Sequence, residues 1–189
     1  MPDRVYQSFT YSNDELDMLK AIARANGTYY QTPAGQTVLF NAANKVPNGL
    51  IFVDTVSGQN ITPTTPTSDF ASLKISGSAA VGVDPISGQN EFQGWIIVNG
   101  SAAIDGTFLM HGLLYVVNDL TYQGTGTGQI VGAVISQNIR DTSSTSIDSD
   151  TGGNSTIIYN CAYAKYGGNQ VPIPQSFTTK AGTYKEAPG

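Results

Sequence analysis

Two side chains in this sequence could support nucleophilic chemistry: His111 is the only histidine and Cys161 the only cysteine. A thiol nucleophile needs an adjacent base, so a Cys161–His111 pair is the one dyad of this type that the chain can form. Neither residue lies in a sequence context typical of a nucleophile, and His111 reads as a surface or turn histidine. We therefore predict no catalytic residue and no enzymatic activity. A single cysteine also excludes an internal disulfide and a zinc site built from several thiolates.

Oxygen-bearing side chains gather in the segment DTSSTSIDSDTGGNST at 141–156. Its candidate calcium ligands are Asp148, Asp150 and Asn154, but the segment lacks the closing glutamate of an EF-hand loop. The glycine-rich segment 124–128 resembles a phosphate-binding loop only superficially, because no Lys-Ser/Thr pair follows it. The sequence therefore predicts no metal and no cofactor.

The charge balance limits the classes of partner. Nine Lys and Arg stand against 14 Asp and Glu, so the formal net charge is −5. Nucleic-acid binding needs a basic surface to neutralise phosphates, and we expect no nucleic-acid partner. No stretch approaches the roughly 20 apolar residues of a membrane-spanning helix. The first residues, MPDRVYQSFT, lack the basic and apolar regions of a signal peptide.

One helix is indicated near the N-terminus. Ser12 and Glu15 have the spacing of a capping box, and Gly27 is suited to end the helix, so we predict a helix over 13–26. Its apolar residues recur at three- and four-residue spacing and form one stripe: Leu16, Leu19, Ile22 and Ala23. This stripe must be buried against another element.

Short apolar runs that begin with glycine recur along the rest of the chain. They are GLIFVD at 49–54, GWIIVN at 94–99, GLLYVVN at 112–118 and GAVISQN at 132–138. The last three glycines lie at 94, 112 and 132, a repeat of about 18 to 20 residues. A second glycine-ended segment belongs to each repeat, at 73–77, 103–106 and 121–124. Stacked repeats of this kind are typical of solenoids, because one repeat alone does not bury its inner face.

From this pattern we predict an all-β fold: a short, right-handed, single-stranded β-helix (solenoid) with one N-terminal amphipathic helix. Residues 1–30 would form an arm and a covering helix, and 31–189 the β-helical domain as a single compact unit. Alternation points Ile96 and Leu114 inward and Trp95 and Tyr115 to an opposite apolar face, which the helix is expected to cover. The alternative architecture is a β-sandwich of antiparallel hairpins.

Five segments also carry a resemblance to a known family: LDMLKAIARANGTYY, VPNGLIFVDTVSG, GWIIVNGSAAIDG, the long stretch that begins GLLYVVNDLTYQG, and the terminal FTTKAGTYKE. From about Leu16 to Glu186 the chain resembles the C-terminal region of bacterial PilX-like type IV pilus-assembly proteins. The resemblance implies a non-enzymatic, minor-pilin-like module that acts in assembly or adhesion. It also implies a location in the periplasm or at the cell surface, as a soluble fragment of a membrane-anchored protein.

The resemblance implies other pilin or pilus-assembly proteins as partners. Exposed aromatic side chains are the expected contacts, and the candidates are Tyr29, Tyr30, Tyr163, Tyr166 and Tyr184. The alternative function is a carbohydrate-binding or carbohydrate-active β-helix domain that recognises surface glycans. Glycoside hydrolysis requires paired carboxyl groups, and the repeat places no such pair on one face.

Overall fold

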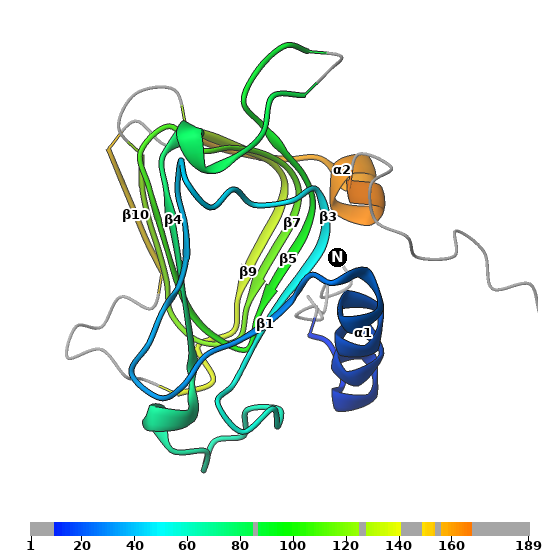
Figure 1. Cartoon of the computed structure of the whole chain (residues 1–189), viewed down its shortest axis with the longest axis vertical. Coiled ribbons are helices and arrows are strands. Elements are labelled where there is room, and N and C mark those ends of the chain that lie inside the picture. The colour runs from blue at the N-terminus through cyan, green and yellow to red at the C-terminus, as the bar shows by residue number, and fades with distance from the viewer. Residues whose placement is uncertain (1–9, 85–86, 125–127, 141–148, 154–155, 168–189) are drawn as a thin grey trace, which may run out of the picture.

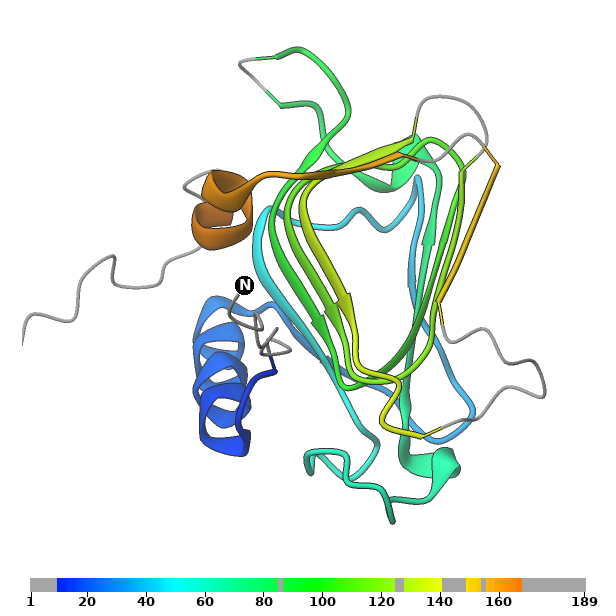
Figure 2. The ribbon, with the colours of Figure 1, turned by 180° about the vertical axis from the view of Figure 1, so that it is seen from behind.

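The chain alternates between two parallel β-sheets that enclose one apolar core, as the computed structural model shows (Figures 1 and 2). The structure describes residues 10–84, 87–124, 128–140, 149–153 and 156–167. The six-stranded sheet has the order β1 (Tyr29–Gln31), β3 (Gly49–Asp54), β5 (Phe92–Val98), β7 (Leu109–Val116), β9 (Gln129–Ser136) and β11 (Thr156–Tyr159). The five-stranded sheet has the order β10 (Ser149–Gly153), β8 (Leu120–Gly124), β6 (Gly100–Asp105), β4 (Ala71–Ser76) and β2 (Val38–Phe40).

The prediction of an all-β, single-stranded β-helix is wrong. The first and second strands of each repeat belong to two separate parallel sheets, and helices pack on one of them, in an α/β-like arrangement. The repeat spacing predicted which segments pair with each other. It does not determine that the first and second segments of each repeat belong to different sheets. The sandwich alternative is also wrong, because every strand pair is parallel.

The repeated glycines lie side by side, as their spacing predicted. Gly49 pairs with Gly94, Gly94 with Gly112, and Gly112 with Gly132. Their φ angles lie between 112° and 153°, a region that side chains rarely adopt. A Cβ atom on Gly112 would lie 1.7 Å from the carbonyl oxygen of Gly94, so only glycine fits at this position. We refer to these four residues as the glycine column.

The space between the sheets is filled by side chains that alternate along the strands. The six-stranded sheet contributes Ile51, Ile96 and Leu114, and the five-stranded sheet contributes Ile75 and Ile104, each with 0% exposure. The predicted inward direction of Ile96 and Leu114 is therefore confirmed. The strands of the six-stranded sheet carry nearly continuous apolar runs, so side chains on both of its faces are apolar. The face that points away from the core must therefore also be covered.

The helix α1 (Asn13–Asn26) covers part of that opposite face (Figure 1). The Ser12 hydroxyl accepts a hydrogen bond from the Glu15 amide at 3.3 Å, and the Glu15 carboxylate accepts one from the Ser12 amide at 2.8 Å. Gly27 ends the helix in the left-handed conformation. Leu16 and Leu19 are buried against this face of the sheet, so the predicted helix and the burial of these two residues are confirmed.

A buried ion pair fixes α1 to the end of β3. The Lys20 Nζ lies 3.0 Å from Asp54 Oδ2, and both side chains are almost fully buried. Asp54 also accepts hydrogen bonds from the Tyr29 hydroxyl at 2.8 Å, the Asn99 side-chain amide at 2.9 Å and the Thr55 backbone amide at 2.9 Å. Such a charge is tolerated in the interior because it is paired and hydrogen-bonded.

Further elements were not predicted from the sequence. The short helix α2 (Cys161–Tyr166) packs on β7 and β9, and the Asn160 side chain caps its first turn. Two 3-10 helices, η1 (Thr67–Asp69) and η2 (Ser78–Ala80), lie in the connections on either side of β4. The domain boundary placed between residues 30 and 31 falls within β1, which is a strand of the six-stranded sheet.

Candidate functional site

The single histidine and the single cysteine occupy neighbouring elements, but they do not form a dyad. His111 lies in β7, with its Nδ1 atom 3.5 Å from the Glu91 carboxylate and its ring stacked on Tyr163 at a centroid distance of 4.6 Å. Cys161 is the exposed first residue of α2. Within the described ranges, no hydrogen bond joins the Cys161 thiol to the His111 ring, and the ring face is occupied by Tyr163.

The candidate calcium ligands lie largely outside the part of the chain that the structure describes. Asp148 and Asn154 are not described, and Asp150 belongs to β10, where it pairs with Thr121. Across the ranges that are described, no group of three or more His, Cys, Asp or Glu side chains is arranged to hold a metal ion. A search of the same residues finds no helix with the length and apolar character needed to cross a membrane.

The candidate contact tyrosines fall into two separate groups. The Tyr29 hydroxyl bonds to Asp54 and accepts a hydrogen bond from Arg24 at 2.9 Å, and the Tyr30 ring packs edge-on against Phe40 at 5.2 Å. Both rings are partly buried by these internal contacts. Tyr163 and Tyr166 lie on α2, at the other end of the sheet, and Tyr184 is outside the described residues. Their role as partner contacts stays a prediction.

A pocket of about 400 Å³ lies between α2 and the helix-covered face of the six-stranded sheet, and we call it the α2 pocket. It forms because α1 packs mainly on β1 and β3 whereas α2 packs on β7 and β9, so part of the apolar face stays uncovered. Its lining residues are Tyr11, Trp95, Leu113, Ala133, Ile135, Tyr159, Cys161, Ala164 and Lys165. The volume lies within the roughly 300–1,000 Å³ of small-ligand sites.

Few polar groups face the α2 pocket. Lys165 is the only charged lining residue in the part of the chain that the structure describes, and its ammonium lies 4.9 Å from the centre of the Tyr166 ring. A hydrogen bond to Tyr166 raises the pKa of Lys165. The indole Nε1 of Trp95 is buried and has no hydrogen-bond partner among the described residues. The pocket therefore suits an apolar group better than a sugar or an ion.

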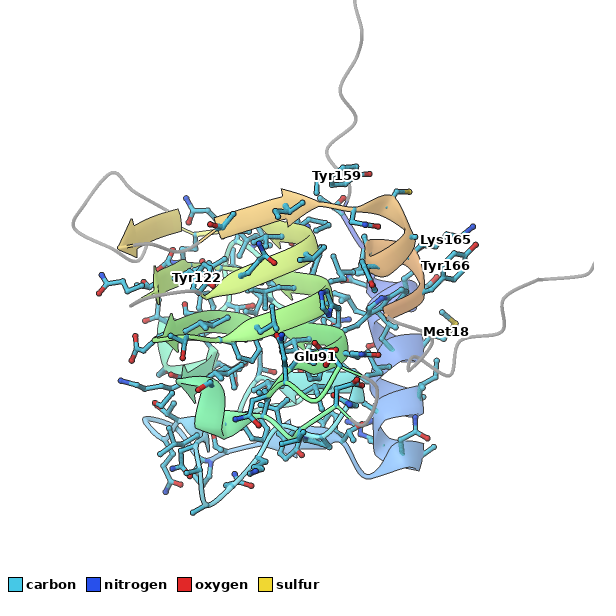
Figure 3. All side chains as sticks on the ribbon, turned by 90° about the horizontal axis from the view of Figure 1, so that it is seen from above. Met18, Glu91, Tyr122, Tyr159, Lys165 and Tyr166 are labelled. Carbon is cyan, nitrogen blue, oxygen red and sulfur yellow. The ribbon has the colours of Figure 1, made fainter. Side chains whose placement is uncertain are left out.

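An exposed apolar strand adjoins this pocket. β11 is the last strand of the six-stranded sheet, and each of its four residues is exposed. Ile157 is 43% exposed, Ile158 44% and Tyr159 76%. Figure 3 shows the strand at the edge of the molecule, with Tyr159 labelled near α2. We call these three residues the β11 edge. Sequence reasoning missed it, although the run TIIY at 156–159 has the apolar, β-branched character of a strand.

The β11 edge and the α2 pocket form one continuous apolar surface, because Tyr159 belongs to both. Comparison with known proteins adds no relative: no family model, no curated protein and no solved structure matches the chain.

Proposed function

We propose that the chain is a non-enzymatic contact module of a type IV pilus or a related filament system, and that it acts outside the cytoplasm in assembly or adhesion. The family resemblance of the sequence supplies the filament system. The surface formed by the β11 edge and the α2 pocket supplies the means of contact.

The observation that carries the proposal is the exposure of Ile157, Ile158 and Tyr159 on a sheet edge. A strand edge offers backbone hydrogen-bonding groups, and folded proteins usually cover or charge such an edge to prevent association. Here three large side chains, none of them charged, accompany the open edge. This combination is typical of a surface that is covered by another protein chain.

Carbohydrate binding has less support from the same surface. A sugar-binding site combines an aromatic ring with several hydrogen-bonding groups, because sugar hydroxyl groups must exchange their bonds to water for bonds to protein. The α2 pocket offers aromatic rings but few such groups. Reproducible binding of the purified chain to defined glycans would favour the carbohydrate alternative over the filament module.

The experiment is a complementation test in the bacterium that encodes the chain. The gene is deleted and then restored as wild type, as Ile158→Lys, or as Leu39→Lys, and surface filaments and adhesion are measured. Leu39 is the matched control, since it is 42% exposed on β2 at the opposite end of the molecule. We expect wild type and Leu39→Lys to restore the filaments or adhesion, and Ile158→Lys to fail. Unchanged filaments and adhesion after deletion would contradict the proposed function.

A further inference from the structure

The two ends of the sheets differ in how completely they are closed. At the β1 and β2 end, Phe40 is 1% exposed and its ring is covered by Tyr30 at a centroid distance of 5.2 Å. At the other end, Ile157 pairs with the fully buried Ile130, yet 43% of Ile157 stays exposed. The apolar interior is therefore covered at one end and open at the β11 end.

Among the described strands, β11 has a neighbour on one side only, which is β9. The amides of Thr156 and Asn160 donate to the carbonyl groups of Gly128 and Gly132, on the side of β9. Backbone groups point to alternate sides along a strand, so the amide and carbonyl groups of Ile157 and Tyr159 face the free edge. These groups would pair with a strand laid against β11.

The strand register does not continue from β11 to β1 in a coaxial head-to-tail stack. Tyr159 pairs with Gly132 and so lies at the level of the glycine column. Tyr29 of β1 pairs with Phe52, which lies at the level of Ile135 through successive strand pairs. The two edge strands therefore cover different parts of the sheet width, and β1 of another copy stacked on the same axis without a shift would not lie opposite β11.

An antiparallel arrangement avoids this mismatch, because β11 of one copy then pairs with β11 of the other copy. We propose that two copies of the chain associate through β11 about a two-fold axis at Ile158. This inference rests on the proposed contact function and names its partner as a second copy. Ile157 of each copy lies opposite Tyr159 of the other, and their backbone groups exchange hydrogen bonds. Such a two-fold contact uses the same surface on both copies and closes at the dimer.

The amino-acid composition of the edge suits self-pairing. No charged residue lies within β11, so two copies bring no like charges into direct opposition. The net charge of −5 on each copy opposes association at long range. At physiological ionic strength this repulsion is screened beyond about 8 Å, so contacts at the edge dominate.

The first experiment measures the mass of the purified full chain by light scattering over a concentration series, with a reducing agent present. We expect the mass to rise from 19.9 kDa towards twice that value. Ile158→Lys should remain monomeric, and so should Ile157→Pro, which removes an edge amide without removing a bond to β9. Leu39→Lys should dimerise like wild type. Circular dichroism shows that each variant is folded. A wild-type monomer at all concentrations, or a folded Ile157→Pro dimer, would overturn the proposal.

The second experiment tests the two-fold axis itself, in a Cys161→Ser background. Residues opposite each other in a non-hydrogen-bonded antiparallel pair have Cα atoms about 4.5 Å apart, within the range of about 4.4–6.8 Å that disulfides require. Ile158→Cys should therefore form a disulfide-linked dimer on mild oxidation, several-fold faster than Leu39→Cys. Equal rates for the two variants would exclude the axis. If the chain is monomeric but Ile158→Lys still abolishes filaments or adhesion in cells, the proposed function stands and the second copy is the wrong partner.

Discussion

At the scale of single residues, the Asp54 carboxylate joins several elements of the described structure. It holds the buried Lys20 ammonium at 3.0 Å and accepts hydrogen bonds from the two side chains of Tyr29 and Asn99. These partners come from α1, β1 and the end of β5, so one carboxylate joins three elements. Removing it leaves the buried Lys20 with only the exposed Asp17 carboxylate, 3.8 Å away, as a counter-charge.

We expect Asp54→Ala to lower the free energy of unfolding by about 3–5 kcal/mol, the usual cost of breaking a buried ion pair from one side. The matched control is Lys74→Met, which removes an exposed ion pair to Asp105 with the same 3.0 Å separation. That change should cost less than about 1 kcal/mol, because exposed pairs contribute little. Urea denaturation of both variants provides the measurement. Equal costs would mean that Asp54 does not stabilise the attachment of α1.

None of the Asp54 network could be predicted from the sequence. Lys20 and Asp54 are 34 positions apart, and no local pattern marks either one as buried. In contrast, α1 was predicted with its observed bounds, because Ser12, Glu15 and Gly27 form caps whose chemistry is local. The helix α2 has comparable caps in Asn160 and Gly167, but at six residues it is too short to show an apolar stripe.

At the scale of elements, the glycine column sets the register of the six-stranded sheet. Gly94, Gly112 and Gly132 each allow the preceding strand to approach where a Cβ would collide, so a strand that slipped by one residue would place a side chain against a carbonyl group. This local requirement explains why the glycine-led runs predicted the strand pairs correctly. The division of the strands into two sheets depends on how the connecting segments turn. The amino-acid composition of those segments does not predict their turns.

We expect Gly112→Ala to destabilise the chain by about 3 kcal/mol or more, since it combines a positive φ with a steric clash. Gly82→Ala is the matched control: its added Cβ would have no heavy atom within 4 Å, and its φ lies outside the strained region. The control should change stability by less than about 0.5 kcal/mol. Thermal unfolding followed by circular dichroism compares the two. A Gly112→Ala variant as stable as the control would show that the sheet adjusts around the extra methyl group.

At the scale of the whole molecule, protection of the backbone should vary along the six-stranded sheet. β5 and β7 each have a strand on both sides and buried side chains, whereas β11 has one neighbour and four exposed residues. We expect hydrogen exchange, measured by mass spectrometry on dilute protein, to be slowest in β5 and β7 and fastest in β11. At high concentration, β11 should become protected if the edges pair. Protection of β11 equal to that of β7 in dilute protein would contradict the open edge.

The lengths of the connections show where this architecture tolerates change. A single residue, Asn99, joins β5 to β6, whereas residues 55–70 separate β3 from β4 and residues 77–91 separate β4 from β5. Long and short connections lead into the same strand register, so the length of a connection does not set the register. Duplicating one repeat would therefore lengthen the molecule by about 4.8 Å, the spacing between neighbouring strands, and leave both ends as they are. The number of repeats would thus set the distance between two binding partners attached at the two ends of the molecule.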